Sequence, residues 1–299
     1  MVTQVDVANW VASMGADLSY NTINGYRSAV SKWIRDETLC EAGNPANRPA
    51  VELVLQGIKR AQAPARARER LAGGRPTPLT PKLLEAMRST LRPPGATPQQ
   101  LMEWAALTLG VHGLLRPSEF LGRYKHMDRA LVRDQCFFYD ALGRGMELSS
   151  PLTPASLQVD LLITKADQSG ANPRVVIDSA RAVADVWEWV QFKRPWFAET
   201  PGVFHITGRS ALSVAQLQRT LEAAARSLHL TGVHFTGRSL RRGGATGALL
   251  AGETAAQVQG RGRWRTARMV GVYTDSRDFN ELAAVMAATA AASASAASR

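Results

Sequence analysis

The sequence predicts a mainly α-helical protein with a small antiparallel β-sheet, an α+β fold. Apolar residues recur at helical spacing near the N-terminus, and threonine–proline pairs farther along mark helix starts. Three short runs rich in β-branched and aromatic residues are typical of strands: 135–140, 157–163 and 174–177. The chain has 299 residues, of which 45% are hydrophobic and 20% charged, so it can form one large core or two ordinary domains.

The first 63 residues predict a small helical domain. One helix is expected over 21–37, with its N-cap at Asn21 or Thr22, and a second is expected over 49–61. The apolar residues of the first helix fall on one face: Ile23, Tyr26, Val30, Trp33 and Ile34. Its opposite face carries basic side chains, which form either a contact surface or an ordinary solvated one: Arg27, Lys32 and Arg35.

A basic linker is expected over 64–78. The stretch 59–75 contains six basic residues and one acid, together with a proline and two glycines but little apolar content. Such a segment suits a tether along a phosphate backbone, and it equally suits a plain connector. We expect a second, larger domain over 79–299.

The second domain is expected to begin with helices at the threonine–proline pairs 80–81 and 97–98. The second of these helices is apolar enough to be buried, and it ends before Pro117, which keeps Arg116 out of helical backbone. An arginine at the end of a buried helix is costly unless it is paired or binds an anion. A structural salt bridge with Glu119 and an anion site explain this arginine equally well.

A hairpin is expected between the second and third strands. Its turn, 164–170, carries Lys165 at the entrance in a chain that otherwise prefers arginine. Lysine can give up a proton where arginine cannot, although a hairpin lysine is also a common solubilising residue.

Helices are predicted to follow over 180–194 and 213–228. A further helix is expected with Ser239 as its N-cap, which places Arg241 in the first turn, where free N–H groups attract phosphate. An apolar helix over 279–288 and a low-complexity tail complete the prediction.

The charge of the chain points to a polyanionic partner. The formal net charge is +11 and the pI is near 10.3, and the stretch 238–273 holds seven arginines and one acid. Cys40 and Cys136 lie apart from other thiols and histidines, which predicts reduced structural residues and no zinc site. The N-terminus does not resemble a signal peptide, and no apolar run is long enough to span a membrane, so we expect an intracellular protein.

The side chains that remain suit phosphoryl transfer through a covalent intermediate. The sequence contains no Walker loop, paired-carboxylate motif or GxSxG elbow. It offers instead two separated arginines, a hairpin lysine, an indole N–H and a tyrosine. A tyrosine oxygen can attack phosphorus, arginine forks can neutralise the phosphate oxygens, and lysine can protonate a leaving oxygen.

Four segments in order resemble the tyrosine recombinases, the phage integrase family: GLLRPSEF, ITKADQSG, RSLRRGGAT and GRWRTARMVGVYT. The resemblance covers the chain after the linker, as the catalytic domain, and more weakly the N-terminal domain, as the core-binding domain. It implies that Arg116 and Arg241 are the catalytic arginines and that Lys165 is the general acid. It further implies that Trp264 stands at the family's histidine-or-tryptophan position and that Tyr273 is the nucleophile.

The resemblance also implies a function. Members of the family cut and rejoin DNA strands through a 3′-phosphotyrosyl link, in a homo-tetramer on double-stranded DNA, with no metal or other cofactor. We expect DNA contacts from these residues: Arg27, Lys32, Arg66, Arg68, Arg70, Arg226, Arg242 and Arg263. A recombinase-derived DNA-binding protein with weak or lost cleavage and a type IB topoisomerase-like enzyme are the alternatives.

One position departs from the family pattern. Its His-x-x-Arg motif reads Arg-Ser-Leu-Arg here, so that Arg238 replaces the histidine. Arginine can bind phosphate but is a poor proton acceptor. In the family the acid at position 119 supports this histidine, so Glu119 is expected to pair with Arg238. His234 is a weaker substitute, because its register is wrong.

Overall fold

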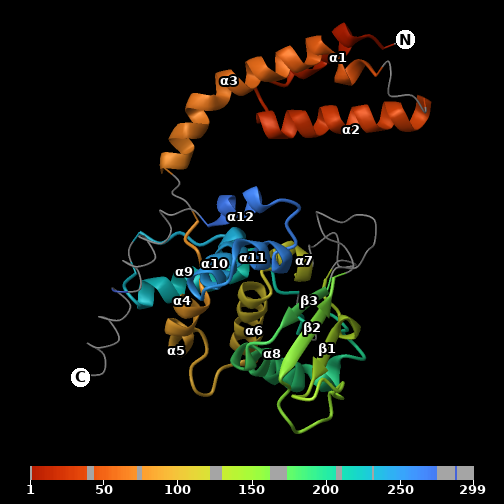
Figure 1. The fold of residues 1–299 in the computed structure, drawn as a ribbon. Coiled ribbons are helices and arrows are strands. Elements are labelled where there is room, and N and C mark those ends of the chain that lie inside the picture. Colours follow the sequence, from red (N-terminus) through yellow and green to blue (C-terminus); the bar gives the residue numbers. More distant parts are fainter. Residues whose placement is uncertain are drawn as a thin grey trace. The chain divides into compact units, whose positions relative to one another are not determined.

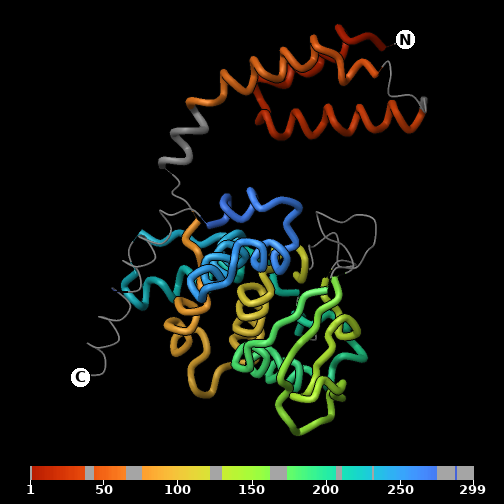
Figure 2. The backbone as a smooth tube through the Cα atoms, in the orientation of Figure 1, coloured from red at the N-terminus to blue at the C-terminus, as the bar shows by residue number. Residues whose placement is uncertain are grey.

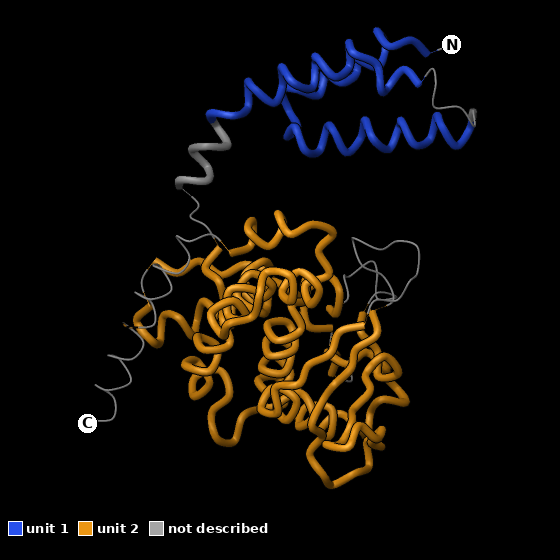
Figure 3. The backbone as a smooth tube through the Cα atoms, in the orientation of Figure 1, with its two compact units in different colours: residues 1–75 blue, residues 76–299 orange. Residues whose placement is uncertain are grey.

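A computed structural model describes residues 2–38, 44–72, 76–121, 130–161, 174–206, 211–230, 232–274 and 287, with the backbone alone at 65–72. The chain forms two compact units, residues 1–75 and residues 76–299 (Figure 3). The division lies inside the stretch 64–78. Each unit has its own hydrophobic core. No helix in the described ranges is both long and apolar enough to cross a membrane.

Unit 1 consists of helices around a small apolar core. They are α1 (Gln4–Ser13), α2 (Tyr20–Thr38), a 3₁₀ turn (Pro45–Asn47) and α3 (Pro49–Ala72) (Figure 1). The core includes Val11, Ile23 and Leu55, each at most 1% exposed. Tyr26 and Trp33, on the apolar face predicted for α2, are 49% and 61% exposed. So small a unit covers only a narrow stripe of α2.

Two helix boundaries in unit 1 differ from the prediction. Helix α2 begins at Tyr20, because the Ser19 hydroxyl accepts the hydrogen bond of the Thr22 N–H at 3.2 Å. Helix α3 continues to Ala72 and includes Pro64, whereas the sequence indicated an end near residue 61. The residues after Pro64 are mostly alanine and arginine, whose high helix propensity opposes the cost of the proline.

Unit 2 is mainly helical with one small sheet (Figures 1 and 2). Its α-helices before the sheet are α4 (Pro81–Ala86), α5 (Arg88–Leu91), α6 (Pro98–His112) and α7 (Pro117–Phe120). Those after the sheet are α8 (Ala180–Lys193), α9 (Val214–Ser227), α10 (Gly237–Leu250), α11 (Ala255–Arg261) and α12 (Ala267–Tyr273). Short 3₁₀ turns lie at Arg133–Gln135 and Arg194–Trp196.

The sheet is antiparallel, with strand order β1 (Cys136–Tyr139), β2 (Ser156–Asp160) and β3 (Arg174–Ile177). Leu157 of β2 lies opposite Phe138 on one side and Ile177 on the other. Alternate residues of β2 and β3 are buried, as expected for a sheet with one face on the core. The mainly helical fold with a small antiparallel sheet is therefore confirmed, although β2 ends three residues before the predicted 163.

Helix α6 lies at the centre of unit 2. Its residues from Met102 to Val111 are all buried, and it packs against α8, α10 and α4. Thr97 caps it as predicted, by accepting from the Gln100 N–H at 3.3 Å. The helix ends in a turn at Gly113 and Leu114, which leads to Arg116, the N-cap residue of α7.

Helix α10 packs unusually close to the segment before α4. A Cβ atom added to Gly243 would lie 1.9 Å from the Leu79 carbonyl oxygen, so only glycine permits this approach. The helix begins at Gly237 with Thr236 as N-cap, three residues before the predicted N-cap Ser239. The Ser239 hydroxyl instead accepts from the Thr236 N–H at 3.0 Å and completes a capping box.

Candidate active site

Four of the predicted site residues meet in unit 2 from separate elements. Arg116 is the N-cap residue of α7, Arg241 lies in the second turn of α10, and Tyr273 is the last residue of α12. Trp264 lies in the turn between α11 and α12. Three helices and one turn thus bring together residues that are up to 157 positions apart in the sequence.

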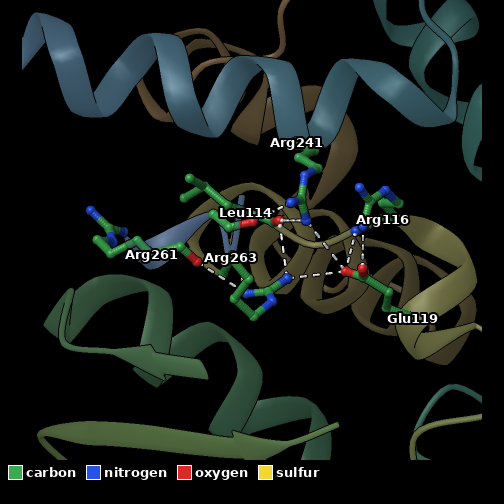
Figure 4. A network of polar contacts seen from close by, with 8 residues as sticks. Leu114, Arg116, Glu119, Arg241, Arg261 and Arg263 are labelled. Atoms are coloured by element: carbon green, nitrogen blue, oxygen red, sulfur yellow. Dashed lines mark hydrogen bonds and ion pairs between the residues drawn. The ribbon is translucent and has the colours of Figure 1, made fainter. Parts of the chain in front are cut away.

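Glu119 is the centre of the polar network at this site (Figure 4). Its side chain is 3% exposed. One carboxylate oxygen, Oε1, accepts from Arg116 Nη1 at 2.7 Å, and the other, Oε2, accepts from the Arg116 backbone N–H at 2.9 Å. Oε2 also accepts from Arg263 Nη2 at 3.1 Å and lies 3.6 Å from Arg241 Nη1.

This network leaves an excess of positive charge. Three guanidinium groups surround one carboxylate, so two positive charges are not balanced within it. Burial of such an excess is costly unless an anion completes the site. A phosphate group carries the complementary charge and matches the planar donor fork of arginine.

Arg241 is held between two turns of the backbone. It is 1% exposed and donates from Nη1 to the Leu114 carbonyl at 2.9 Å and from Nη2 to the Gly262 carbonyl. Burial lowers the pKa of Arg241 to about 10, an effect that Glu119 partly opposes. Arg241 therefore stays protonated at neutral pH.

The aromatic part of the site lies over Arg241. The guanidinium carbon is 4.6 Å from the centre of the Trp264 ring and 5.9 Å from that of Tyr273. The two rings are 5.1 Å apart. Trp264 is 6% exposed, whereas Tyr273 is half-buried and keeps some access to solvent.

Two buried donors in this cluster have no hydrogen-bond partner among the described residues: Arg241 Nε and Trp264 Nε1. An unsatisfied buried donor costs about 1–3 kcal/mol. Both groups donate and neither accepts. The chemistry of the cluster therefore suits an oxygen-rich anion, held by guanidinium and indole N–H groups beside a phenol.

The predicted partner of Glu119 was wrong. Arg238 lies on the exposed side of α10, and its backbone N–H donates to the Thr236 hydroxyl at 3.2 Å. The arginines that contact Glu119 are Arg116, Arg241 and Arg263. The turn after α11 places Arg263, and not Arg238, beside Glu119. Lys165 lies outside the described residues.

The residues expected to contact DNA differ in their surroundings. Arg226, near the end of α9, is exposed. Lys32 is exposed and pairs with Asp36, and Arg27 is half-buried and donates to Asn24 and Asn47. The side chains of Arg66, Arg68 and Arg70 lie outside the described residues.

Two further arginines expected to contact DNA are largely covered by the protein. Arg242 is 8% exposed, and the side chain of Arg263 is 13% exposed. The sequence also gave no sign of the Leu114 and Gly262 carbonyls that hold Arg241. Every residue has a carbonyl, so residue type carries no such signal.

Fold and site together define a class: a helical protein with a small sheet, whose buried arginines frame a tyrosine. No protein-family model matches the chain, and no curated protein sequence matches it either. Among solved structures, the XerH site-specific recombinase bound to difH substrate in a pre-cleavage complex matches with a TM-score of 0.55 at 15% identity, covering 94% of this chain and 70% of that one.

A second XerH structure, a post-cleavage complex with palindromic difH substrate, matches with a TM-score of 0.53 at 14% identity, covering 94% of this chain and 69% of that one. Likeness at such identity establishes the fold. The chain has the fold of the tyrosine recombinases, the family whose motifs its sequence resembles.

Proposed function

We propose that this protein is a site-specific DNA recombinase that cuts and rejoins strands through a 3′-phosphotyrosyl intermediate. The observation that carries the proposal is that Arg241 and Trp264 lie against Tyr273, while Glu119 joins Arg241 to Arg116. A tyrosine that served only as a core residue would need no guanidinium 5.9 Å from its ring and no unpaired indole N–H beside it.

The chemistry follows from these groups. The Tyr273 hydroxyl, which keeps some access to solvent, loses its proton to water as its oxygen attacks the phosphorus of a backbone phosphate. The new bond forms as the bond between phosphorus and the 5′ oxygen breaks. Arg116 and Arg241 stabilise the charge on the non-bridging oxygens. The leaving 5′ oxygen takes up a proton, for which the resemblance assigns Lys165 as donor.

The products of cleavage are a 3′-phosphotyrosyl ester and a free 5′ hydroxyl. One phosphate ester replaces another, so the step needs no external energy source. Attack by the 5′ hydroxyl of a second duplex reverses the chemistry: it releases Tyr273 and joins two strands that were separate before. This exchange distinguishes recombination from the relaxation carried out by a topoisomerase.

The proposed partner is double-stranded DNA, bound by both units, with four copies of the chain on two duplexes. The net charge of +11 supports a nucleic-acid partner. The two XerH structures support it by likeness, since both are described with their difH substrates. The proposed site of action is the DNA inside the cell.

The proposal is tested on duplexes that carry the flanks of the protein's own gene. A nick beside the cleavage position lets the cut fragment diffuse away, so the covalent complex accumulates. We expect a covalent protein–DNA band with the wild type and none with Tyr273→Phe. A wild type that shifts the DNA without forming this band is a DNA-binding protein, and the proposal then fails.

A second measurement separates the recombinase from a topoisomerase-like enzyme. The protein is incubated with two labelled duplexes of different length, and in parallel with a supercoiled plasmid that lacks the site. Recombination predicts hybrid products from the two duplexes. Relaxation of the plasmid without hybrid products would favour the topoisomerase.

A further inference from the structure

We propose that Arg263 is a positioning residue of the strand-transfer site, which fixes Glu119 and thereby the two arginines that bind phosphate. The inference rests on the proposed function and adds a residue to it. Arg263 was expected to contact DNA, but its side chain is only 13% exposed and points into the Glu119 network (Figure 4).

Arg263 connects two turns that carry the predicted catalytic residues. Its own turn, after α11, leads to Trp264, and the turn after α6 leads to Arg116. From Nη2, Arg263 donates to Glu119 Oε2 at 3.1 Å and to the Leu114 carbonyl at 3.4 Å. From Nη1 it donates to the Gly113 carbonyl at 3.4 Å and to the Arg261 carbonyl at 3.1 Å.

Arg241 connects the same two turns, because it donates to the Leu114 carbonyl and to the Gly262 carbonyl. The two arginines therefore share Leu114 as an acceptor and Glu119 as a counter-charge. Their other contacts differ. Arg241 lies against the Trp264 and Tyr273 rings, whereas Arg263 does not share those contacts. Arg263 therefore holds in place the two turns between which Arg241 lies.

The backbone at Arg263 supports this assignment. Its φ is +52°, a left-handed conformation that glycine adopts freely and other residues adopt at a cost of about 1 kcal/mol or more. Leu114, the acceptor that it shares with Arg241, has a φ of +49°. The side-chain contacts of Arg263 offset a backbone conformation that would favour glycine.

The charge of Arg263 matters as well as its hydrogen bonds. Without the Arg263 guanidinium, Glu119 Oε2 would still accept from the Arg116 N–H at 2.9 Å. It would attract Arg241 Nη1, now 3.6 Å away, more strongly. Arg241 would then move toward Glu119 and away from the Leu114 carbonyl. A small misplacement of a group that binds the reacting phosphate slows the chemical step far more than it weakens DNA binding.

The test uses the full chain, a nicked duplex from its gene flanks, and four substitutions. Arg263→Met removes the charge at similar length, Arg263→Lys keeps the charge, and Arg263→Gly also removes the backbone strain. Arg265→Met is the matched control, because Arg265 is exposed two residues later. The rate constant for the covalent complex is measured at saturating DNA, and the dissociation constant is measured separately by gel shift.

We expect Arg263→Met and Arg263→Gly to lower the rate constant about 10- to 100-fold, with less than about a threefold change in affinity. Arg263→Lys should recover part of the rate. Arg265→Met should leave the rate at saturating DNA within about twofold of the wild type. The glycine variant is the control for misfolding, because glycine adopts the left-handed backbone at position 263 without strain. Rates within twofold of the wild type for both variants, or a loss confined to affinity, would overturn the assignment.

Hydrogen exchange of the free protein provides a test that does not depend on cleavage. If Arg263 fixes Glu119, then Arg263→Met should speed amide exchange at least fivefold in the peptide spanning 113–121, where Glu119 accepts from the Arg116 N–H. Arg265→Met should leave amide exchange in this peptide unchanged. Should the wild type form no covalent complex, the proposed function fails and this exchange result alone decides the role of Arg263. Unchanged amide exchange in Arg263→Met would then overturn the positioning role of Arg263.

Discussion

Replacing Glu119 with glutamine should destabilise unit 2 strongly. The substitution keeps the shape of the side chain but removes the one negative charge among three buried or half-buried guanidinium groups. It weakens three hydrogen bonds of 3.1 Å or less, two from Arg116 and one from Arg263. Removing one partner of a buried ion pair costs about 3–5 kcal/mol, because the remaining charges are left uncompensated.

The expected change in stability is therefore about 3–5 kcal/mol, which lowers the melting temperature by roughly 10 °C for a unit of this size. Urea unfolding followed by tryptophan fluorescence measures it. Glu147→Gln, at an exposed acid in the same unit, is the control and should change stability by less than about 0.5 kcal/mol. An unfolding free energy for Glu119→Gln within about 1 kcal/mol of the wild type would refute the central place of Glu119.

Three further predictions test other parts of the account. Gly243→Ala should destabilise unit 2 by at least about 2 kcal/mol in urea unfolding, because its Cβ would lie 1.9 Å from the Leu79 oxygen; Gly260→Ala, with no atom within 4 Å, should be neutral or stabilising. Burial, and to a lesser degree the charge of Arg261, lower the pKa of His112 below its usual 6.5. The unfolded chain therefore binds more protons at this residue, and stability is lost as the pH falls below about 6.5. His112→Gln should make the stability profile flatter between about pH 6.5 and 5, and a slope equal to that of the wild type would contradict this. Arg238→His should retain or raise covalent-complex formation on the nicked duplex without changing the melting temperature, since Arg238 is exposed, and abolished cleavage would show that the arginine itself is required.

Local signals in the sequence predicted much of the fold. Thr97 before Pro98 fixes a helix start through a side-chain hydrogen bond and a preset φ, both of which act within a few residues. The strand β3 has the bounds that its residue pattern indicated. The grouping of Arg116, Arg241 and Tyr273 into one site was a prediction from the motif resemblance, because spacing alone does not place residues this far apart in one site.

Features that depend on tertiary packing were not predictable in the same way. Helical periodicity placed Tyr26 and Trp33 on one apolar face, but it cannot tell how much of that face the partner helices cover. The pairing of Glu119 with Arg263 depends on a left-handed turn at a non-glycine residue, which sequence propensities disfavour. The continuation of α3 through Pro64 likewise opposes the usual interpretation of proline as a helix end.

Direct identification of the nucleophile tests the central claim most sharply. The wild type is incubated with the nicked duplex, the covalent complex is digested with nuclease and trypsin, and the peptides are analysed by mass spectrometry. The account predicts a nucleotide attached through its 3′ phosphate to Tyr273, in the tryptic peptide 269–277. A nucleotide attached to any other residue, or bound DNA with peptide 269–277 unmodified, would contradict it.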